Sequence, residues 1–194
     1  MAFEHTSVPV WATTRPGVPD RARSVAVLGF CPDTATGPDS GPDSGSGSDV
    51  AGVVDSWVDE AEIRGLPVSA LRSSSPEPAL RWLTAEAGRA VVGWRLLVAG
   101  PEALVLRARA RALELGALPA EVVPYVTGTP SRVVHCAHCA TDSDVPVAIG
   151  DTCACAGCGR TLHVYYHVSR RLGAYLGFQH DAEDAEPVRP ESLP

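Results

Sequence analysis

Two short motifs, Cys136-Ala137-His138-Cys139 and Cys155-Ala156-Gly157-Cys158, decide how the C-terminal part of this chain folds. Each motif is a CxxC, and fifteen residues separate them. This spacing is typical of a metal site with four thiolate ligands held between two tight turns, as in a zinc ribbon. Gly159 follows the second motif and can supply the positive φ that such a turn needs. We therefore predict one tetrathiolate metal site.

The metal that fits this donor set is zinc, because structural zinc sites take closed sets of four cysteines. A rubredoxin-like iron is the alternative, and it would make the chain an electron carrier. A disulfide pairing of the same cysteines, or substitution of one ligand by Cys153, His135 or His138, is also open. A closed site leaves no position for water, so we expect the metal to stabilise a small ribbon domain and not to perform catalysis.

The composition excludes several classes of protein. All sixteen basic residues are arginine, so the chain has no lysine for a Schiff base or for a P-loop. A net charge of −7 argues against nucleic acid or an anionic membrane as partner. No signal peptide or long apolar run is present, and clustered cysteines suit a reducing compartment, so we expect a cytoplasmic protein with no membrane contact.

Four regions follow from the patterning. We predict an irregular segment at 1–21, an α/β domain at 22–128 with a flexible Gly/Ser/Pro/Asp insert at 32–49, a zinc ribbon at 131–180 and an acidic tail at 181–194. Within the α/β domain, apolar runs at 24–30, 66–71, 94–99 and 121–126 indicate strands, and helices are expected to begin near 50, 76 and 102. Alternation of strands and helices predicts a small parallel sheet.

The α/β domain resembles the nicotinamide-binding half of ferredoxin reductases. The resemblance lies in Leu97-Val98-Ala99-Gly100-Pro101-Glu102 and the helix after it, and in Leu71-Arg72-Ser73. It implies that Gly100 and Pro101 would lie beside a nicotinamide and that Arg72 and Ser73 would contact the adenosine part of NAD(P)H. The glycine-rich phosphate turn of that family is missing, because the first strand continues into Cys31-Pro32 and the polar insert. We therefore expect NAD(P)H binding to be lost, with retained binding as the alternative.

The ribbon and the residues after it resemble the C-terminal domain of the dimethylamine monooxygenase small-subunit (DmmA-like) family. The pattern is Cys155-x-x-Cys158 followed by His167-x-Ser169-Arg170 and by Gly173-x-Tyr175-x-Gly177-Phe178. The resemblance implies an accessory, non-catalytic subunit of a multicomponent NADPH-dependent monooxygenase that demethylates dimethylamine. Its partners would be a flavin and iron–sulfur reductase subunit and an iron-dependent oxygenase subunit, and its task would be to organise them.

A strand at 162–168 alternates apolar with aromatic or histidine side chains, which suits contact with another protein. Residue types that are common in interface hot spots cluster here. The candidates for the partner interface are Arg160, Tyr165, His167, Arg170, Arg171, Tyr175 and Phe178. Two alternatives stay open: that Tyr175 and Phe178 only cover the small core of the ribbon, and that Arg160, Arg170 and Arg171 belong to a nucleic-acid-binding ribbon. A third is that the chain itself transfers electrons or binds NAD(P)H.

Overall fold

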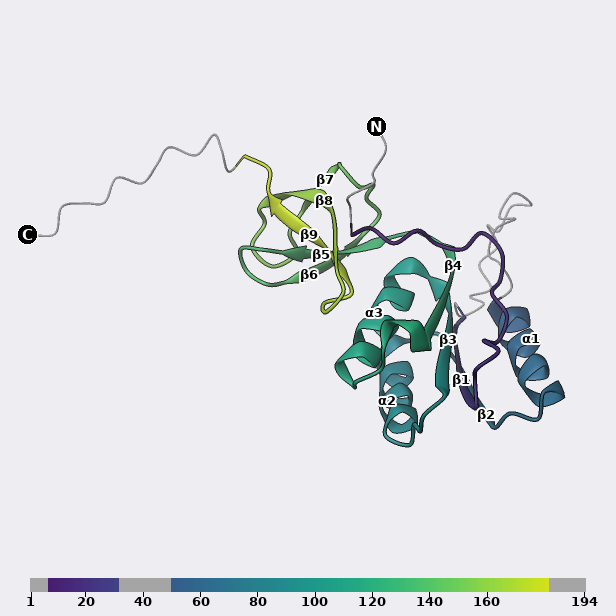
Figure 1. The fold of residues 1–194 in the computed structure, drawn as a ribbon. Coiled ribbons are helices and arrows are strands. Elements are labelled where there is room, and N and C mark those ends of the chain that lie inside the picture. Colours follow the sequence, from purple (N-terminus) through teal and green to yellow (C-terminus); the bar gives the residue numbers. More distant parts are fainter. Residues whose placement is uncertain (1–6, 32–49, 182–194) are drawn as a thin grey trace, which may run out of the picture.

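The computed structural model describes residues 7–31 and 50–181 (Figure 1), so the predicted insert at 32–49 and nearly all of the acidic tail lie outside the described residues. The chain is α/β, as predicted, with a four-stranded parallel sheet of order β2-β1-β3-β4 followed by a five-stranded sheet of order β6-β5-β9-β8-β7. The first sheet and its helices contain β1 (Ser24–Phe30), α1 (Val50–Ile63), β2 (Val68–Ser73), α2 (Pro76–Ala87), β3 (Trp94–Pro101), α3 (Glu102–Glu114), the 3-10 helix η1 (Pro119–Glu121) and β4 (Val122–Gly128).

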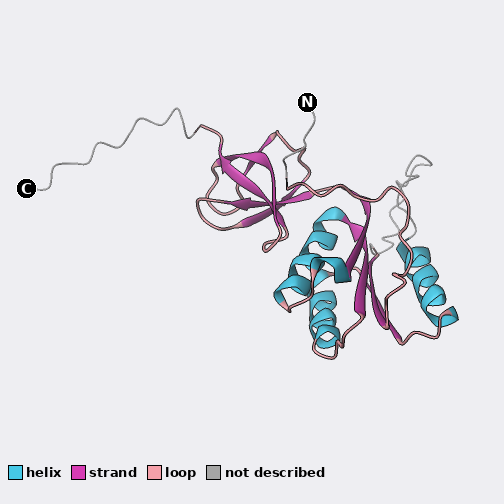
Figure 2. Ribbon diagram, in the orientation of Figure 1, coloured by secondary structure: helices cyan, strands magenta, loops and turns pink. Residues whose placement is uncertain are grey.

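Helices cover both faces of the parallel sheet, with α1 on one side and α2 and α3 on the other (Figures 1 and 2). The sequence of strand β1 is apolar throughout because both of its faces are buried. Val25 and Val27 pack with α1, whereas the alternate residues Ala26, Leu28 and Phe30 pack with α2 and α3. A strand buried on both faces needs no polar alternation.

Strand β2 begins at Val68, two residues after the start that the apolar run predicts. The reason is the end of α1. Gly65 takes a φ of +66°, and the N–H of Leu66 donates to the carbonyl of Ala61 at 2.9 Å. This is the hydrogen bond that closes a helix ending in a left-handed residue, so Leu66 completes α1 and does not join the sheet.

The second sheet contains β5 (Arg132–Cys136), β6 (Asp142–Val145), β7 (Thr152–Ala154), β8 (Thr161–Ser169) and β9 (Ala174–Gln179). It packs against α3. Leu106 of α3 joins the buried cluster of the second sheet, and the carbonyl oxygen of Leu106 lies so close to Gly173 that an added Cβ there would be 2.6 Å away. The turn between β8 and β9 therefore lies directly on the helix.

Residues 7–19, which we call the N-terminal strap, contact both parts of the chain. The indole N–H of Trp57 in α1 donates to the carbonyl of Pro16 at 2.6 Å, and the N–H of Val18 donates to Glu60 Oε1 at 2.8 Å. At the other end of the strap, the N–H of Val168 in β8 donates to the hydroxyl oxygen of Ser7 at 2.9 Å. Figure 1 shows the strap running from the second sheet to α1.

Among residues 7–31 and 50–181, no helix combines the length and the apolar character that a membrane crossing requires.

Candidate metal centre

The two CxxC motifs form matching turns, one after β5 and one after β7. In the first, the N–H of Ala140 donates to the carbonyl of Cys136 at 2.9 Å, and in the second the N–H of Gly159 donates to the carbonyl of Cys155 at 3.0 Å. Ala140 and Gly159 both have positive φ, at +59° and +70°. The glycine predicted to permit the second turn therefore has that role, and Ala140 adopts the same conformation in the first.

The turns bring the four sulfur atoms of Cys136, Cys139, Cys155 and Cys158 within 4.8 Å of one another. The Cys139–Cys155 and Cys136–Cys158 sulfur pairs are 3.5 and 3.8 Å apart, so neither pair is a disulfide. A zinc–sulfur bond of about 2.3 Å gives a tetrahedron with edges of about 3.8 Å. The donor set therefore fits a tetrahedral metal ion such as zinc.

Two contacts fix the turns against each other. The N–H of Ala156 donates to the hydroxyl oxygen of the buried Ser143 at 3.0 Å, which ties the second turn to β6. Gly157 lies against Thr141, because an added Cβ would be 2.3 Å from the Thr141 hydroxyl oxygen. A side chain at position 157 would push the two turns apart.

Hydrogen bonds to the sulfurs favour the thiolate form at two positions. The hydroxyl and the backbone N–H of Thr141 lower the pKa of the Cys139 thiol to about 6, and the backbone N–H of Cys158 lowers that of Cys155. The backbone N–H of Arg160 acts in the same direction on Cys158, but burial and the neighbouring thiols outweigh it and raise the pKa of Cys158 to about 11. A bound cation would relieve the repulsion that keeps this last thiol protonated.

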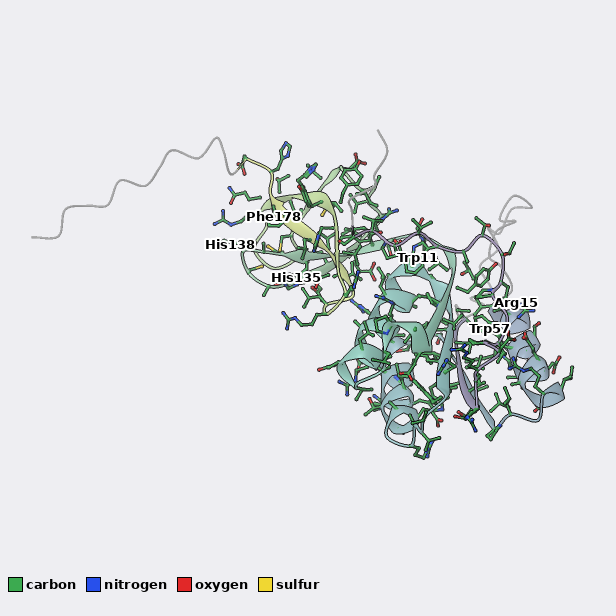
Figure 3. All side chains as sticks on the ribbon, in the orientation of Figure 1. Trp11, Arg15, Trp57, His135, His138 and Phe178 are labelled. Carbon is green, nitrogen blue, oxygen red and sulfur yellow. The ribbon has the colours of Figure 1, made fainter. Side chains whose placement is uncertain are left out.

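The neighbouring residues do not enter the cluster of four. His135 places Nδ1 2.7 Å from a carboxylate oxygen of Asp142. His138 is exposed on the first turn, at the end of the ribbon remote from α3 (Figure 3). Cys153 lies on β7, where burial and the nearby Cys155 raise the pKa of its thiol.

The residues suggested for NAD(P)H lie in two places at the carboxyl ends of the parallel strands. At the end of β3, Gly100 has a φ of +147°, and an added Cβ would lie 2.7 Å from the Cβ of Phe30. Pro101 then precedes α3. At the end of β2, Arg72 pairs with Asp55 of α1, and Ser73 donates to the carbonyl of Ser75. Phe30 thus packs closely on Gly100 at the end of β3, whereas the Arg72–Asp55 pair at the end of β2 is exposed. NAD(P)H binding stays an untested prediction.

A buried carboxylate lies directly after this Gly-Pro turn. Glu102 is 2% exposed, and its Oε1 accepts hydrogen bonds from the indole of Trp11 at 2.7 Å and the phenol of Tyr175 at 3.0 Å. Its Oε2 lies 3.5 Å from Nε of Arg132, whose guanidinium stacks over the Tyr175 ring. Three segments meet here, and Trp11 lies between the ribbon and α3 in Figure 3. The sequence reasoning missed Glu102, Trp11 and Arg132, because each partner is distant in sequence.

The candidates for the partner interface separate into buried and exposed residues. Tyr175 is 1% exposed and belongs to the buried cluster of the second sheet, which agrees with the alternative that this residue covers the core of the ribbon. Tyr165 and Phe178 are 52% and 45% exposed, and their rings pack edge to face with centroids 5.8 Å apart. We call Tyr165 and Phe178, with His163 and His180 stacked beside them, the aromatic face of β8 and β9.

The other four candidates lie at the rim of the second sheet. Arg160 is half-buried and donates to the side-chain oxygen of Gln179 at 2.5 Å. His167 is exposed on β8, and Arg170 and Arg171 are exposed at the turn between β8 and β9, next to α3. Of these four residues, Arg160 and His167 are near the aromatic face in sequence or through Gln179, whereas Arg170 and Arg171 lie on the turn beside α3.

Parts of the chain are similar in sequence to known proteins. Residues 133–178 match the family described as dimethylamine monooxygenase subunit DmmA-like, C-terminal domain. The chain is also 40% identical over 92 residues to the heme-dependent oxidative N-demethylase delta subunit of Ectopseudomonas mendocina (strain ymp), across 47% of this chain and 51% of the relative. It thus spans about half the length of the curated relative that it matches. No solved structure matches the chain. Residues 133–178 are therefore similar to the C-terminal domain of the DmmA-like proteins.

Proposed function

We propose that this chain is an accessory, non-catalytic subunit of a cytoplasmic oxidative N-demethylase that acts on a small secondary amine such as dimethylamine. The observation that carries the proposal is the 40% identity to the delta subunit of a heme-dependent oxidative N-demethylase. The DmmA-like match over the ribbon supports the same assignment. The oxygenase iron, as heme, would belong to another subunit, and a flavin and iron–sulfur reductase would deliver electrons from NADPH.

The metal in this proposal is one structural Zn²⁺ held by Cys136, Cys139, Cys155 and Cys158. Four thiolates fill a tetrahedral ion completely, so no position is left for a substrate or for water. The ribbon also has a modest buried cluster of its own, centred on residues such as Val134, Leu162 and Val164. A bound ion would supply part of the folding free energy that so small a core lacks.

We propose that the aromatic face is the surface that docks to the oxygenase or reductase subunit. Tyr165 and Phe178 expose large rings on a sheet, and such rings contribute strongly when a partner excludes water from them. The surface that we propose leaves out Tyr175, which is 1% exposed. Its side chain would instead hold the ribbon against α3 through Glu102.

The test is to purify the tagged chain from cells that express the whole complex, identify the co-purifying subunits by mass spectrometry and count metals in the same sample. We expect one zinc per chain, an iron-containing oxygenase, a reductase, and NADPH oxidation that depends on dimethylamine. Iron in the ribbon would make the chain an electron carrier. Bound nucleic acid in place of these subunits would refute the assignment.

A pair of variants tests the docking surface. We expect Phe178→Ser to lower co-purification of the partner subunits about tenfold or more, as loss of an interface hot spot does. Leu118→Ser is the matched control, because Leu118 is 62% exposed on the α/β domain, away from the ribbon. Equal recovery of partners with both variants would show that docking occurs elsewhere.

A further inference from the structure

A small cavity lies at the junction of the strap, α3 and the ribbon. It has a volume of about 200 Å³ and is lined by Ser7, Val8, Pro9, Arg109, Val168 and Arg170. Arg109 comes from α3, and Arg170 comes from the turn between β8 and β9 that lies on this helix. Two cationic side chains from separate parts of the chain therefore face one space.

Neither of these arginines has a carboxylate partner within the described residues. Six other arginines there each pair with a carboxylate: Arg15, Arg72, Arg89, Arg95, Arg111 and Arg132. Arg109 is half-buried, and desolvation together with the positive charge of Arg170 lowers its pKa. Two like charges beside a partly desolvated space repel each other, and an anion between them would remove that repulsion.

Ser7 adds a neutral donor to the same cavity. Its hydroxyl oxygen accepts the hydrogen bond from the N–H of Val168 at 2.9 Å. A serine hydroxyl has one hydrogen to donate in addition, and no acceptor for it is present in the described part of the chain. The cavity therefore offers two guanidinium groups and one hydroxyl group, all of them donors.

We propose that this cavity binds a single phosphate group. A volume of about 200 Å³ is below that of sites for drug-sized ligands, which favours one small oxyanion. Phosphate near neutral pH carries a charge between −1 and −2, so it can neutralise both guanidinium groups, whereas a carboxylate would leave one unbalanced. The same phosphate chemistry can come from free inorganic phosphate or from a small phosphate monoester. Bound phosphate would join α3 to the ribbon, independently of the demethylase assignment.

The test uses the purified full-length chain with its metal, in a buffer free of phosphate and sulfate. Inorganic phosphate and glycerol phosphate are titrated separately, with thermal unfolding and calorimetry as readouts, and sodium chloride keeps the ionic strength constant. We expect saturable binding that raises the melting temperature. Saturation by both compounds assigns a phosphate ester site, and saturation by inorganic phosphate alone assigns a site for the free ion; either supports the proposal. No saturable effect of either compound would overturn it.

Arginine variants locate the effect. We expect Arg109→Gln and Arg170→Gln to weaken phosphate binding about tenfold or more, because each removes a charge-assisted hydrogen bond. Without phosphate, the same variants should melt at or above the wild-type temperature, since each removes a repulsion. Arg171→Gln is the matched control, because it deletes the same charge from the same turn but lies outside the cavity lining. Equal weakening by Arg171→Gln would show a diffuse charge effect and refute the site.

Discussion

Replacement of Tyr175 by phenylalanine is expected to change how the stability of this protein depends on alkaline pH. The substitution removes one hydroxyl and keeps the ring, which is 1% exposed and lies under the Arg132 guanidinium. The lost hydroxyl donates to Glu102 Oε1 at 3.0 Å, in the contact between α3 and the ribbon. A hydrogen bond to a charged acceptor contributes about 1.5–3 kcal/mol, so the variant should be less stable by that amount near pH 8.

The magnitude of the pH effect follows from the raised pKa of this phenol. Burial, and then the negative charge of Glu102, raise the pKa of Tyr175 from 10 to about 12. The folded state therefore favours the protonated phenol. Its stabilising contribution is complete below about pH 10 and is lost as the pH rises to about 12. A difference of two pKa units at 1.36 kcal/mol each corresponds to roughly 2–3 kcal/mol.

The measurement is urea unfolding of the wild type and of Tyr175→Phe at a series of pH values from 8 to about 11.5. Cysteines and the other tyrosines also titrate in this range, so the quantity compared is the difference in stability between the two proteins, in which their contributions cancel. We expect the stability difference between the two proteins to shrink as the pH rises. Tyr165→Phe, at a half-exposed ring, is the control. A difference that stays constant across the range would refute the proposed link between Tyr175 and Glu102.

Two further predictions concern the turn on α3 and the metal. Gly173→Ala should destabilise the protein by about 2–4 kcal/mol, because the residue has positive φ and its new Cβ would collide with the carbonyl of Leu106. Gly116→Ala is the control: this residue also has positive φ but faces open space, so the substitution should cost about 1–2 kcal/mol. Equal losses of stability in urea unfolding would contradict this reasoning. In the metal-bound protein we expect a thiol reagent to react only with Cys31 and Cys153. Removal of the metal with a chelator should make all six cysteines reactive and lower the melting temperature. Six reactive thiols before chelation would exclude a bound metal.

The sequence predicts those parts of the fold and site that depend on local patterns. Apolar runs such as 24–30 indicate buried strands because both faces of the parallel sheet are covered, and the CxxC turns assemble from residues that are neighbours in the chain. The start of β2 was misplaced because Leu66 satisfies the apolar pattern of a strand while it closes α1.

Contacts between distant residues were beyond sequence reasoning. Glu102 follows a Gly-Pro turn and begins a helix, where an exposed carboxylate is ordinary. Its burial arises from Trp11 and Tyr175, which lie 91 and 73 positions away. In the same way, Arg109 of α3 and Arg170 meet only through folding, because the turn that carries Arg170 lies on this helix.

The strap imposes an order on folding during synthesis. Residues 7–19 leave the ribosome before either sheet exists, and the N–H that Ser7 accepts belongs to Val168, 161 positions later. Closing so long a loop is slow, because its entropy must be lost before the contact forms. The contact between Ser7 and Val168 therefore forms late, after β8 has been made. The other end of the strap can pack on α1 much earlier, because Pro16 and Val18 bond to Trp57 and Glu60 only 41 and 42 positions later.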